Sequence, residues 1–397
     1  VDNSISGGYY SHIRSAYLAY GDKMTKAKTK MKYTQQIVVP KEVVSLRQKG
    51  KVWSGAHTFT QVVKKTGVSS IQTLFSIMSC ARPYRSKGCD DFCLELFYVL
   101  EDYLKAEAEV DAVGNIIVFV GEKPTILWSC HTDTVHPQHS GYSPLVYDNM
   151  FVCSKDKRQL GADDGVGIWI MLSMINAKIP GLYIFHAGEE CGGIGSSYIA
   201  DHNKALLTGI DQAIAFDRKG THSVITHQSG GKCCSNLFAK DLCVALNMGH
   251  TPDDTGVFTD TANYIYDIPE CTNVSAGYYG EHTFNEFLNF KYAVALRDNL
   301  IVAHKNGSLS AMRVGKDVAA KPAPYRYDYS SNGYYDDGYG QDFQFANYAR
   351  YGSGYDSKTD SDRYDELAEL VSRDPDTAAA ILMDLGITEE YFRSYWK

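Results

Sequence analysis

The chain has 397 residues, of which 44% are hydrophobic and 22% are charged, as is usual for a globular protein with a sizeable core. No apolar run approaches the roughly 18 to 20 residues that a membrane span requires, and no signal-peptide pattern is visible. The cysteines lack zinc-finger spacing, and adjacent Cys233 and Cys234 disfavour a simple disulfide framework. We therefore expect a cytoplasmic protein with reduced thiols, although the start at Val1 leaves a processed precursor open.

The net charge of −8 conceals a basic N-terminal segment. Residues 1–68 carry 12 Lys and Arg against 3 Asp and Glu, a balance of +9 that leaves −17 for the remainder. We interpret this segment as an N-terminal extension, part of which packs on the body through Trp53 and Phe59. Its charge would suit nucleic acid, an acidic partner or the body itself. Solvated lysines on a surface helix are favoured over nucleic-acid binding.

From residue 69 onward, apolar periodicity predicts helices and strands in alternation. Amphipathic helices are expected over 71–78 and 90–104, and a strand over 115–120 with the strand 125–130 as its neighbour. The elements expected next are a helix over 166–175, a strand over 182–185, a helix over 194–204 and a strand over 212–216. This alternation predicts an α/β fold, specifically a three-layer α/β/α sandwich around a mostly parallel mixed sheet.

The remaining sequence predicts the end of this domain and two smaller segments. The domain, placed at 69–315, is completed by a strand over 222–227, a helix over 236–246, a loop or short helix over 260–268, a strand that reaches Gly277 and a helix over 284–304. Residues 316–360 hold nine tyrosines between Tyr325 and Tyr355 and predict an extended or disordered linker. Residues 361–397 predict a small helical module for docking.

Two adjacent acids, Glu189 and Glu190, follow the apolar strand 182–185. In open α/β sheets, ligands bind in the crevice at the carboxyl ends of the strands. Neighbouring carboxylates repel each other unless a cation or a proton separates them. Adjacent strand residues point to opposite sides, so a bend at Gly188 is needed to present both acids. These features predict a metal site at this end of the strand.

The same pattern of an apolar run beside a metal-competent residue recurs along the chain. His131 follows the strand 125–130, Asp163 precedes the helix 166–175, Asp217 follows the strand 212–216, and His282 follows the strand that reaches Gly277. Imidazoles and carboxylates in this mixture suit zinc, with cobalt or manganese as feasible substitutes. Each signal is weak alone, and their order makes the combination specific.

Five motifs carry a resemblance to a known superfamily: His131-Thr-Asp-Thr-Val135, Gly161-Ala-Asp-Asp-Gly165, Gly188-Glu-Glu-Cys-Gly-Gly-Ile-Gly-Ser196, Asp217 and Glu281-His282-Thr283. In this order they resemble the co-catalytic dizinc exopeptidases, which include tripeptidases, glutamate carboxypeptidases and leucyl-type aminopeptidases. The stretch from Phe258 to Glu286 is similar to the tripeptidases in particular. The resemblance covers about residues 70–305.

The resemblance implies a ligand set for two zinc ions. His131 would bind one ion and His282 the other, and the carboxylate of Asp163 would bridge them. Glu190 and Asp217 would complete the set, one on each ion.

Two further residues have catalytic roles by the same resemblance. Asp133 would accept a hydrogen bond from the second ring nitrogen of His131 and so fix its tautomer. Glu189 would be the general base, which stays off the metals, takes a proton from the attacking water and passes it to the leaving amine.

The chain departs from tripeptidase-like relatives in one respect. A lid or dimerisation domain follows the Asp217-type ligand in those relatives, whereas here only 64 residues separate Asp217 from His282. We therefore expect a lidless catalytic domain. The tyrosines that could replace a lid-borne oxyanion donor are Tyr264, Tyr278 and Tyr279, and the cations that could hold a substrate carboxylate or form a surface ion pair are Arg218 and Lys219.

The first expectation is a dinuclear zinc hydrolase, an aminopeptidase or small-peptide exopeptidase that acts on a peptide or a small amide. The second is an amidohydrolase of the same fold that removes an acyl group from a non-peptide amide. The third is a scaffold that retains the fold without turnover, against which the complete ligand set argues. The basic extension and the helical module suggest a protein partner or a homo-oligomer.

Overall fold

The computed structural model describes residues 39–54, 58–137, 141–156 and 158–315. All of these residues belong to the first of two compact units, Val1–Ala346. The elements predicted over 316–360 and 361–397 lie outside the described residues. None of the ten cysteines, all of which are described, forms a disulfide. In these same ranges, no helix combines the length and apolar character that a bilayer crossing demands.

Several helices begin where a short polar side chain satisfies one of their first free N–H groups. Ser70, Ser86 and Ser235 each accept a hydrogen bond from the backbone N–H three residues later, as N-cap residues do. The described helices are α2 (Lys41–Lys49), α3 (Phe59–Thr66), α4 (Ile71–Ser79), α5 (Lys87–Tyr98), η1 (Val99–Tyr103), α6 (Ala162–Asn176), α7 (Ile194–His202), η2 (Lys204–Leu207), α8 (Asn236–Leu246), η3 (Asp260–Tyr264) and α9 (Phe290–Lys305).

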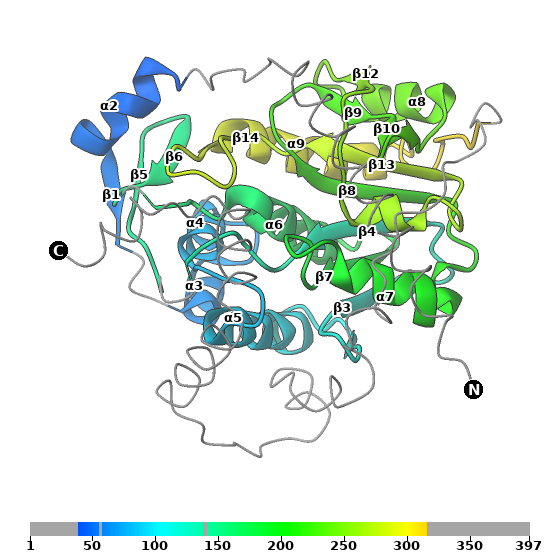
Figure 1. Cartoon of the computed structure of the whole chain (residues 1–397), viewed down its shortest axis with the longest axis horizontal. Coiled ribbons are helices and arrows are strands. Elements are labelled where there is room, and N and C mark those ends of the chain that lie inside the picture. Colours follow the sequence, from blue (N-terminus) through cyan, green and yellow to red (C-terminus); the bar gives the residue numbers. More distant parts are fainter. Residues whose placement is uncertain (1–38, 55–57, 138–140, 157, 316–397) are drawn as a thin grey trace, which may run out of the picture. The chain divides into compact units, whose positions relative to one another are not determined.

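A mixed eight-stranded sheet forms the centre, in the order β12-β9-β13-β8-β4-β7-β3-β2. Its strands are β2 (Ala108–Val110), β3 (Ile116–Val120), β4 (Ile126–His131), β7 (Gly181–His186), β8 (Gln212–Arg218), β9 (Ser223–Ile225), β12 (Thr251–Asp253) and β13 (Glu270–Ser275). The four strands β13, β8, β4 and β7 run parallel to their neighbours in this group. Figure 1 shows them side by side.

One predicted strand pairing is wrong. β3 does not neighbour β4, because β7 lies between them and pairs with both strands. After β4 the chain forms two strands of another sheet, within residues 145–154, then α6, and returns as β7 parallel to β4. Parallel neighbours require such a crossover connection. β3 then pairs antiparallel with the other side of β7, with Ile116 opposite Phe185. Sequence periodicity identifies strands but does not specify which strand takes the free edge.

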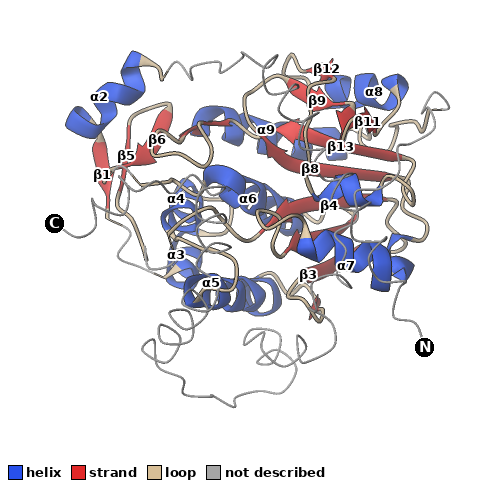
Figure 2. Cartoon of the chain, viewed as in Figure 1, coloured by secondary structure: helices blue, strands red, loops and turns tan. Residues whose placement is uncertain are grey.

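Helices cover both faces of this sheet (Figure 2). Successive residues of β4 pack against different helices. Trp128 lies in a core shared with α4, α5, α6, α8 and α9. Leu127 lies in a second core, with α7, η2 and η3. The alternation of side chains along a strand places these residues on opposite faces. The structure therefore confirms the three-layer α/β/α architecture.

The described part of the predicted N-terminal extension packs on the body, as Trp53 and Phe59 predict. Phe59 and Val63 of α3 lie in the same buried core as Phe92 of α5, with the Phe59 and Phe92 rings 5.4 Å apart. This packing continues across the boundary predicted at residue 69.

A second, antiparallel sheet of five strands was not predicted. Its order is β1-β5-β6-β15-β14, and its strands are β1 (Lys51–Trp53), β5 (Leu145–Tyr147), β6 (Phe151–Ser154), β14 (Tyr278–Tyr279) and β15 (Phe287–Asn289). A small hairpin pairs β10 (His227–Gln228) with β11 (Gly231–Lys232). The segment 284–304, predicted as one helix, thus begins as β15 and becomes helical only at Phe290. The short connection between β14 and β15 carries His282.

Candidate metal centre

The predicted site residues meet at the carboxyl edge of the parallel strands. His131 is the last residue of β4, opposite His186 at the end of β7, and Asp217 lies near the end of β8. Glu189 and Glu190 follow β7 in a turn that Gly188 begins at φ +72°. This backbone conformation confirms the predicted bend, and it is one that glycine adopts at no steric cost.

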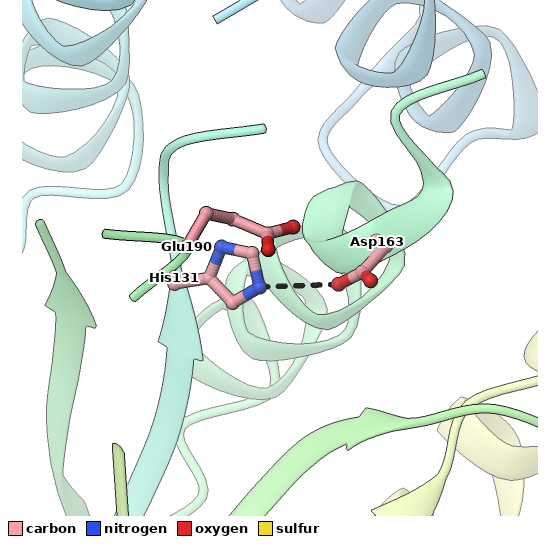
Figure 3. A group of neighbouring side chains, drawn as sticks. All are labelled: His131, Asp163 and Glu190. Carbon is pink, nitrogen blue, oxygen red and sulfur yellow. Dashed lines mark hydrogen bonds and ion pairs between the residues drawn. The ribbon is translucent and has the colours of Figure 1, made fainter. Parts of the chain in front are cut away.

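Asp163 occupies the middle of the site, with one carboxylate oxygen facing each of two histidines. Its Oδ1 lies 3.1 Å from Nε2 of His131, and its Oδ2 lies 3.2 Å from Nε2 of His282. Figure 3 shows the His131 ring and the Asp163 carboxylate pointing toward each other, with the Glu190 carboxylate beside them. A carboxylate in this position is suited to bridge two cations.

The remaining two predicted ligands divide between the histidines. Glu190 Oε1 lies 2.9 Å from Nε2 of His282, and Asp217 Oδ1 lies 3.6 Å from Nε2 of His131. The ligand atoms of His131, Asp163 and Glu190 lie within 4.8 Å of one another. The fold therefore brings the five predicted residues together around Asp163, with Glu190 near both histidines and Asp217 beside His131.

The pKa values of these groups reveal uncompensated negative charge. Burial raises the pKa of Glu190 to about 7, and the charge of Asp163 adds to the rise. Hydrogen bonds to Asp163 and Glu190 raise the pKa of His282 to about 11. Burial opposes the charged form of His131, yet its hydrogen bonds to Asp133 and Asp163 outweigh burial and raise its pKa well above the usual range. These shifts follow from carboxylates and imidazoles that are crowded together in a buried position.

Glu189 differs from Glu190 in its surroundings. It lines the pocket that opens over this cluster. No histidine among the described residues lies within ion-pair distance of its carboxylate. Burial raises the pKa of Glu189 well above its usual value, and the charge of Asp217 adds to this effect. A carboxyl group beside the cluster and outside both histidine pairs has the position expected of a general base or acid.

Asp133 lies beside His131, but its main-chain carbonyl is closer to the ring than the predicted carboxylate. Nδ1 of His131 lies 3.0 Å from the backbone carbonyl oxygen of Asp133 and 3.6 Å from its carboxylate Oδ1. The carboxylate instead accepts hydrogen bonds from the backbone N–H groups of Gly188, Glu189 and Glu190, at 3.0, 3.1 and 3.2 Å. Asp133 therefore orients His131 through its main chain and holds the turn of the two glutamates through its side chain.

Glu286 is a site residue to which the sequence analysis assigned no role. Its carboxylate is buried and accepts hydrogen bonds from four successive backbone N–H groups, those of Leu160, Gly161, Ala162 and Asp163, at 2.6 to 3.1 Å. It thereby ties the segment after His282 to the turn that carries Asp163. A Glu four residues after a candidate ligand gives no sequence signal of this function, because its partners are backbone groups.

Several other candidates have structural roles. Asp164 lies near His131 and Asp217. Its carboxylate oxygens already accept hydrogen bonds from the backbone N–H groups of Gly167, at 3.0 Å, and His131, at 3.3 Å. Nε2 of His186 lies 2.7 Å from the hydroxyl of Tyr264, so Tyr264 is engaged within the core. The Tyr279 ring stacks on Phe287.

Tyr278 is the predicted tyrosine that reaches the site. Its hydroxyl donates to Asp217 Oδ1 at 2.9 Å, and its ring lines the pocket. This hydrogen bond orients the side chain of Asp217, a candidate ligand.

A pocket of about 310 Å³ opens over this cluster. The candidate ligands Asp163, Glu190, Asp217 and His282 contribute to its lining, together with Glu189 and the cations Arg218 and Lys219. Ile225, Val257 and Phe258 supply apolar surface. A larger cavity of about 470 Å³ lies beside Trp53, Phe75, Tyr147 and Phe290, but its lining holds no cluster of imidazoles and carboxylates. The smaller pocket is therefore the candidate active site.

The donor set fits two divalent cations. Two imidazole nitrogens and three carboxylates suit zinc by ligand type, and the shared Asp163 carboxylate allows both cations to be held close together. Divalent charge would replace the protons that the raised pKa values of Glu190 and His282 indicate.

Comparisons with known proteins match the chain to no family model and to no curated protein. Among solved structures, it is similar to a tripeptidase from Staphylococcus aureus, with 14% identity over 63% of this chain and 99% of that chain, at a TM-score of 0.48. It is also similar to aminopeptidase PepT from Bacillus cereus (15% identity, 62% and 98% coverage, TM-score 0.44) and to an aminopeptidase from the archaeon Desulfurococcus kamchatkensis (11%, 62% and 98%, 0.47). All three are peptidases, the class that the motifs resemble. At such identities and TM-scores the likeness does not assign a function, so the residues of the site must do so.

Proposed function

We propose that the chain is a dinuclear zinc-dependent exopeptidase of the aminopeptidase or small-peptide type. The observation that carries this proposal is the position of Asp163, whose two carboxylate oxygens face Nε2 of His131 and Nε2 of His282. Glu190 and Asp217 lie one beside each histidine. The motif resemblance to dizinc exopeptidases supports the same ligand set.

Two zinc ions at such a site lower the pKa of a shared water and polarise the scissile carbonyl. Individual side chains of the protein would then have separate roles. His131, Asp163, Glu190, Asp217 and His282 would hold the ions.

Glu189 would accept the proton of the attacking water and deliver it to the leaving amine, since it lines the pocket outside both histidine pairs. Asp133 would keep Glu189 in place through the hydrogen bond to its backbone N–H. Tyr278 would orient Asp217.

The test combines metal content with turnover. The purified full chain should hold about two zinc ions per chain, and it should release N-terminal residues from dipeptides and aminoacyl anilides in a manner that chelator abolishes and zinc restores. A matched panel with acetylated amines separates the two enzyme classes. If the acetylated substrates are preferred, the protein is an amidohydrolase. Absence of bound metal after incubation with zinc would refute both the exopeptidase and the amidohydrolase function.

A further inference from the structure

Two cations, Arg218 and Lys219, line the candidate active site immediately after Asp217 in the chain. Arg218 ends β8, so its backbone is fixed by the sheet, where it pairs with Ser275 of β13. The side chains of Arg218 and Lys219 are the only Lys or Arg side chains among the described residues that line this pocket. Any anionic part of a bound molecule would therefore meet them first.

Arg218 is held in place on one side and has a free donor on another. Its Nη2 donates to the Oγ1 and the carbonyl oxygen of Thr255, at 2.9 and 3.3 Å, and lies 3.8 Å from Asp253 Oδ2. Its Nε is buried and has no hydrogen-bond acceptor. Buried donors are nearly always satisfied in native proteins, so an unsatisfied one in the lining of a pocket indicates that a ligand supplies the acceptor.

Lys219 is available to assist. Its ammonium contacts Glu281 Oε1, while about half of its side chain stays exposed to solvent. The contact keeps the ammonium at the pocket, because Glu281 also lines it and directly precedes the candidate ligand His282. A half-exposed lysine can reorient toward an additional carboxylate at little cost.

Bound metal would offset most of the negative charge of the site. Two divalent ions would balance four carboxylates among Asp163, Glu189, Glu190, Asp217 and Glu281. Arg218 and Lys219 would then face only the remaining carboxylate and Asp253, which lies 3.8 Å from Arg218 Nη2. A guanidinium presents a rigid set of N–H donors that matches the geometry of a carboxylate.

We propose that Arg218, assisted by Lys219, binds a carboxylate of the substrate close to the scissile bond. This inference rests on the proposed exopeptidase function and narrows its substrates to short molecules with a carboxylate next to the scissile bond. The carboxylate has two sources, the free C-terminus of a dipeptide and the side chain of an Asp or Glu residue next to the scissile bond. Arg218 and the candidate ligand Asp217 line the same pocket, so the carboxylate that Arg218 binds lies in the pocket of the candidate metal centre.

The experiment measures binding rather than turnover, in full-length, zinc-loaded protein that carries Glu189→Gln to prevent hydrolysis. Calorimetric titration compares Ala-Ala with Ala-Ala amide, which tests the C-terminal carboxylate. It also compares Ala-Glu amide with Ala-Gln amide, which tests the side-chain carboxylate. We expect the acid of one pair to bind about ten- to a hundredfold more tightly than its amide, as for a hydrogen bond to a charged group.

Adding Arg218→Gln should reduce this preference to about twofold or less while the affinity for the amides stays unchanged. Arg218→Lys should retain part of it, and Lys240→Gln on the exposed surface of α8 should leave it intact. Zinc content and thermal unfolding verify that each variant is folded and loaded. If Arg218→Gln does not fold, Arg218→Lys and Lys219→Gln provide the same comparison.

Equal affinity for acid and amide in both pairs would overturn the inference, as would a preference that survives Arg218→Gln. Failure of the proposed function is recognised separately. In that case the protein with Glu189 intact would hydrolyse neither the carboxylate-bearing dipeptides nor their amides, whatever its carboxylate preference in binding.

Discussion

Glu286 and Asp163 are joined by a hydrogen bond from the backbone N–H of Asp163 to Glu286 Oε1 at 3.1 Å. The same carboxylate accepts from the three preceding N–H groups. The turn that presents Asp163, the proposed bridging acid, is therefore built around a side chain that follows His282 by four residues. The two ends of the candidate metal centre are coupled through this one buried carboxylate.

Glu286→Gln should weaken zinc binding about ten- to a hundredfold, as for residues that position metal ligands. The amide would turn its NH2 toward backbone donors, and the free energy of unfolding should fall by about 2 kcal/mol because buried donors lose their acceptor. Zinc titration against a competing chelator and denaturant unfolding measure the two effects. Glu109→Gln, on the exposed surface of β2, is the control, and an unchanged zinc affinity in Glu286→Gln would contradict this positioning role.

The two adjacent glutamates should respond differently to the same substitution. Glu189→Gln should lower kcat about a hundred- to ten-thousandfold, the usual contribution of general base catalysis, with both metal ions retained. Glu190→Gln should lose zinc, because Glu190 Oε1 lies 2.9 Å from His282 Nε2 and belongs to its ligand group. Elemental analysis and initial rates in parallel measure both outcomes. Loss of metal from Glu189→Gln would exchange the two assignments, making Glu189 the metal ligand and Glu190 the general base.

The substitution Asp133→Asn tests whether the main-chain carbonyl or the carboxylate of Asp133 supports His131. The substitution preserves the main-chain carbonyl that lies 3.0 Å from His131 Nδ1, but it weakens the acceptor for the N–H groups of the glutamate turn. We therefore expect kcat to fall about tenfold or more while zinc affinity stays within about threefold of the parent protein. A large loss of zinc affinity would instead show that the carboxylate acts on His131.

The stability of the protein should fall in mild acid because His250 is buried and neutral. Burial lowers the pKa of His250 to about 4, and the charge of His222 adds to this effect. The His250 Nε2 lies 2.6 Å from the hydroxyl of Tyr292, which itself donates to the carbonyl of Ser275. The unfolded chain binds the proton near pH 6.5 and the folded chain only near pH 4, so the free energy of unfolding decreases as the pH falls through this window.

The loss that His250 contributes should be on the order of 2 kcal/mol. Denaturant unfolding between pH 7 and pH 4 measures it, and His250→Gln should flatten the dependence by up to one proton. His202→Gln, on the exposed surface of α7, should leave the slope as it is. An unaltered slope in His250→Gln would assign the acid sensitivity to other groups.

Much of the candidate site could be predicted because its residues occupy the ends of regular elements. A strand that ends in His131 and another that ends before Glu189 must bring these side chains to one edge when the strands run parallel. The roles of Glu286 and of the Asp133 carboxylate could not be predicted, because both side chains bind backbone N–H groups. Such donors exist at almost every position and leave no mark in the sequence.

From the sequence alone followed the α/β class, the alternation of strands and helices from residue 115 onward, and the four residues that the fold gathers around Asp163. These properties depend on local periodicity and on residue chemistry, which the sequence records directly. Only the tertiary structure decided that β7 separates β3 from β4, that α3 belongs to the main core, and that Glu190 pairs with His282 while Asp217 lies beside His131. These are relations between segments far apart in the chain. They are determined by which surfaces can be buried together, and no local pattern encodes that choice.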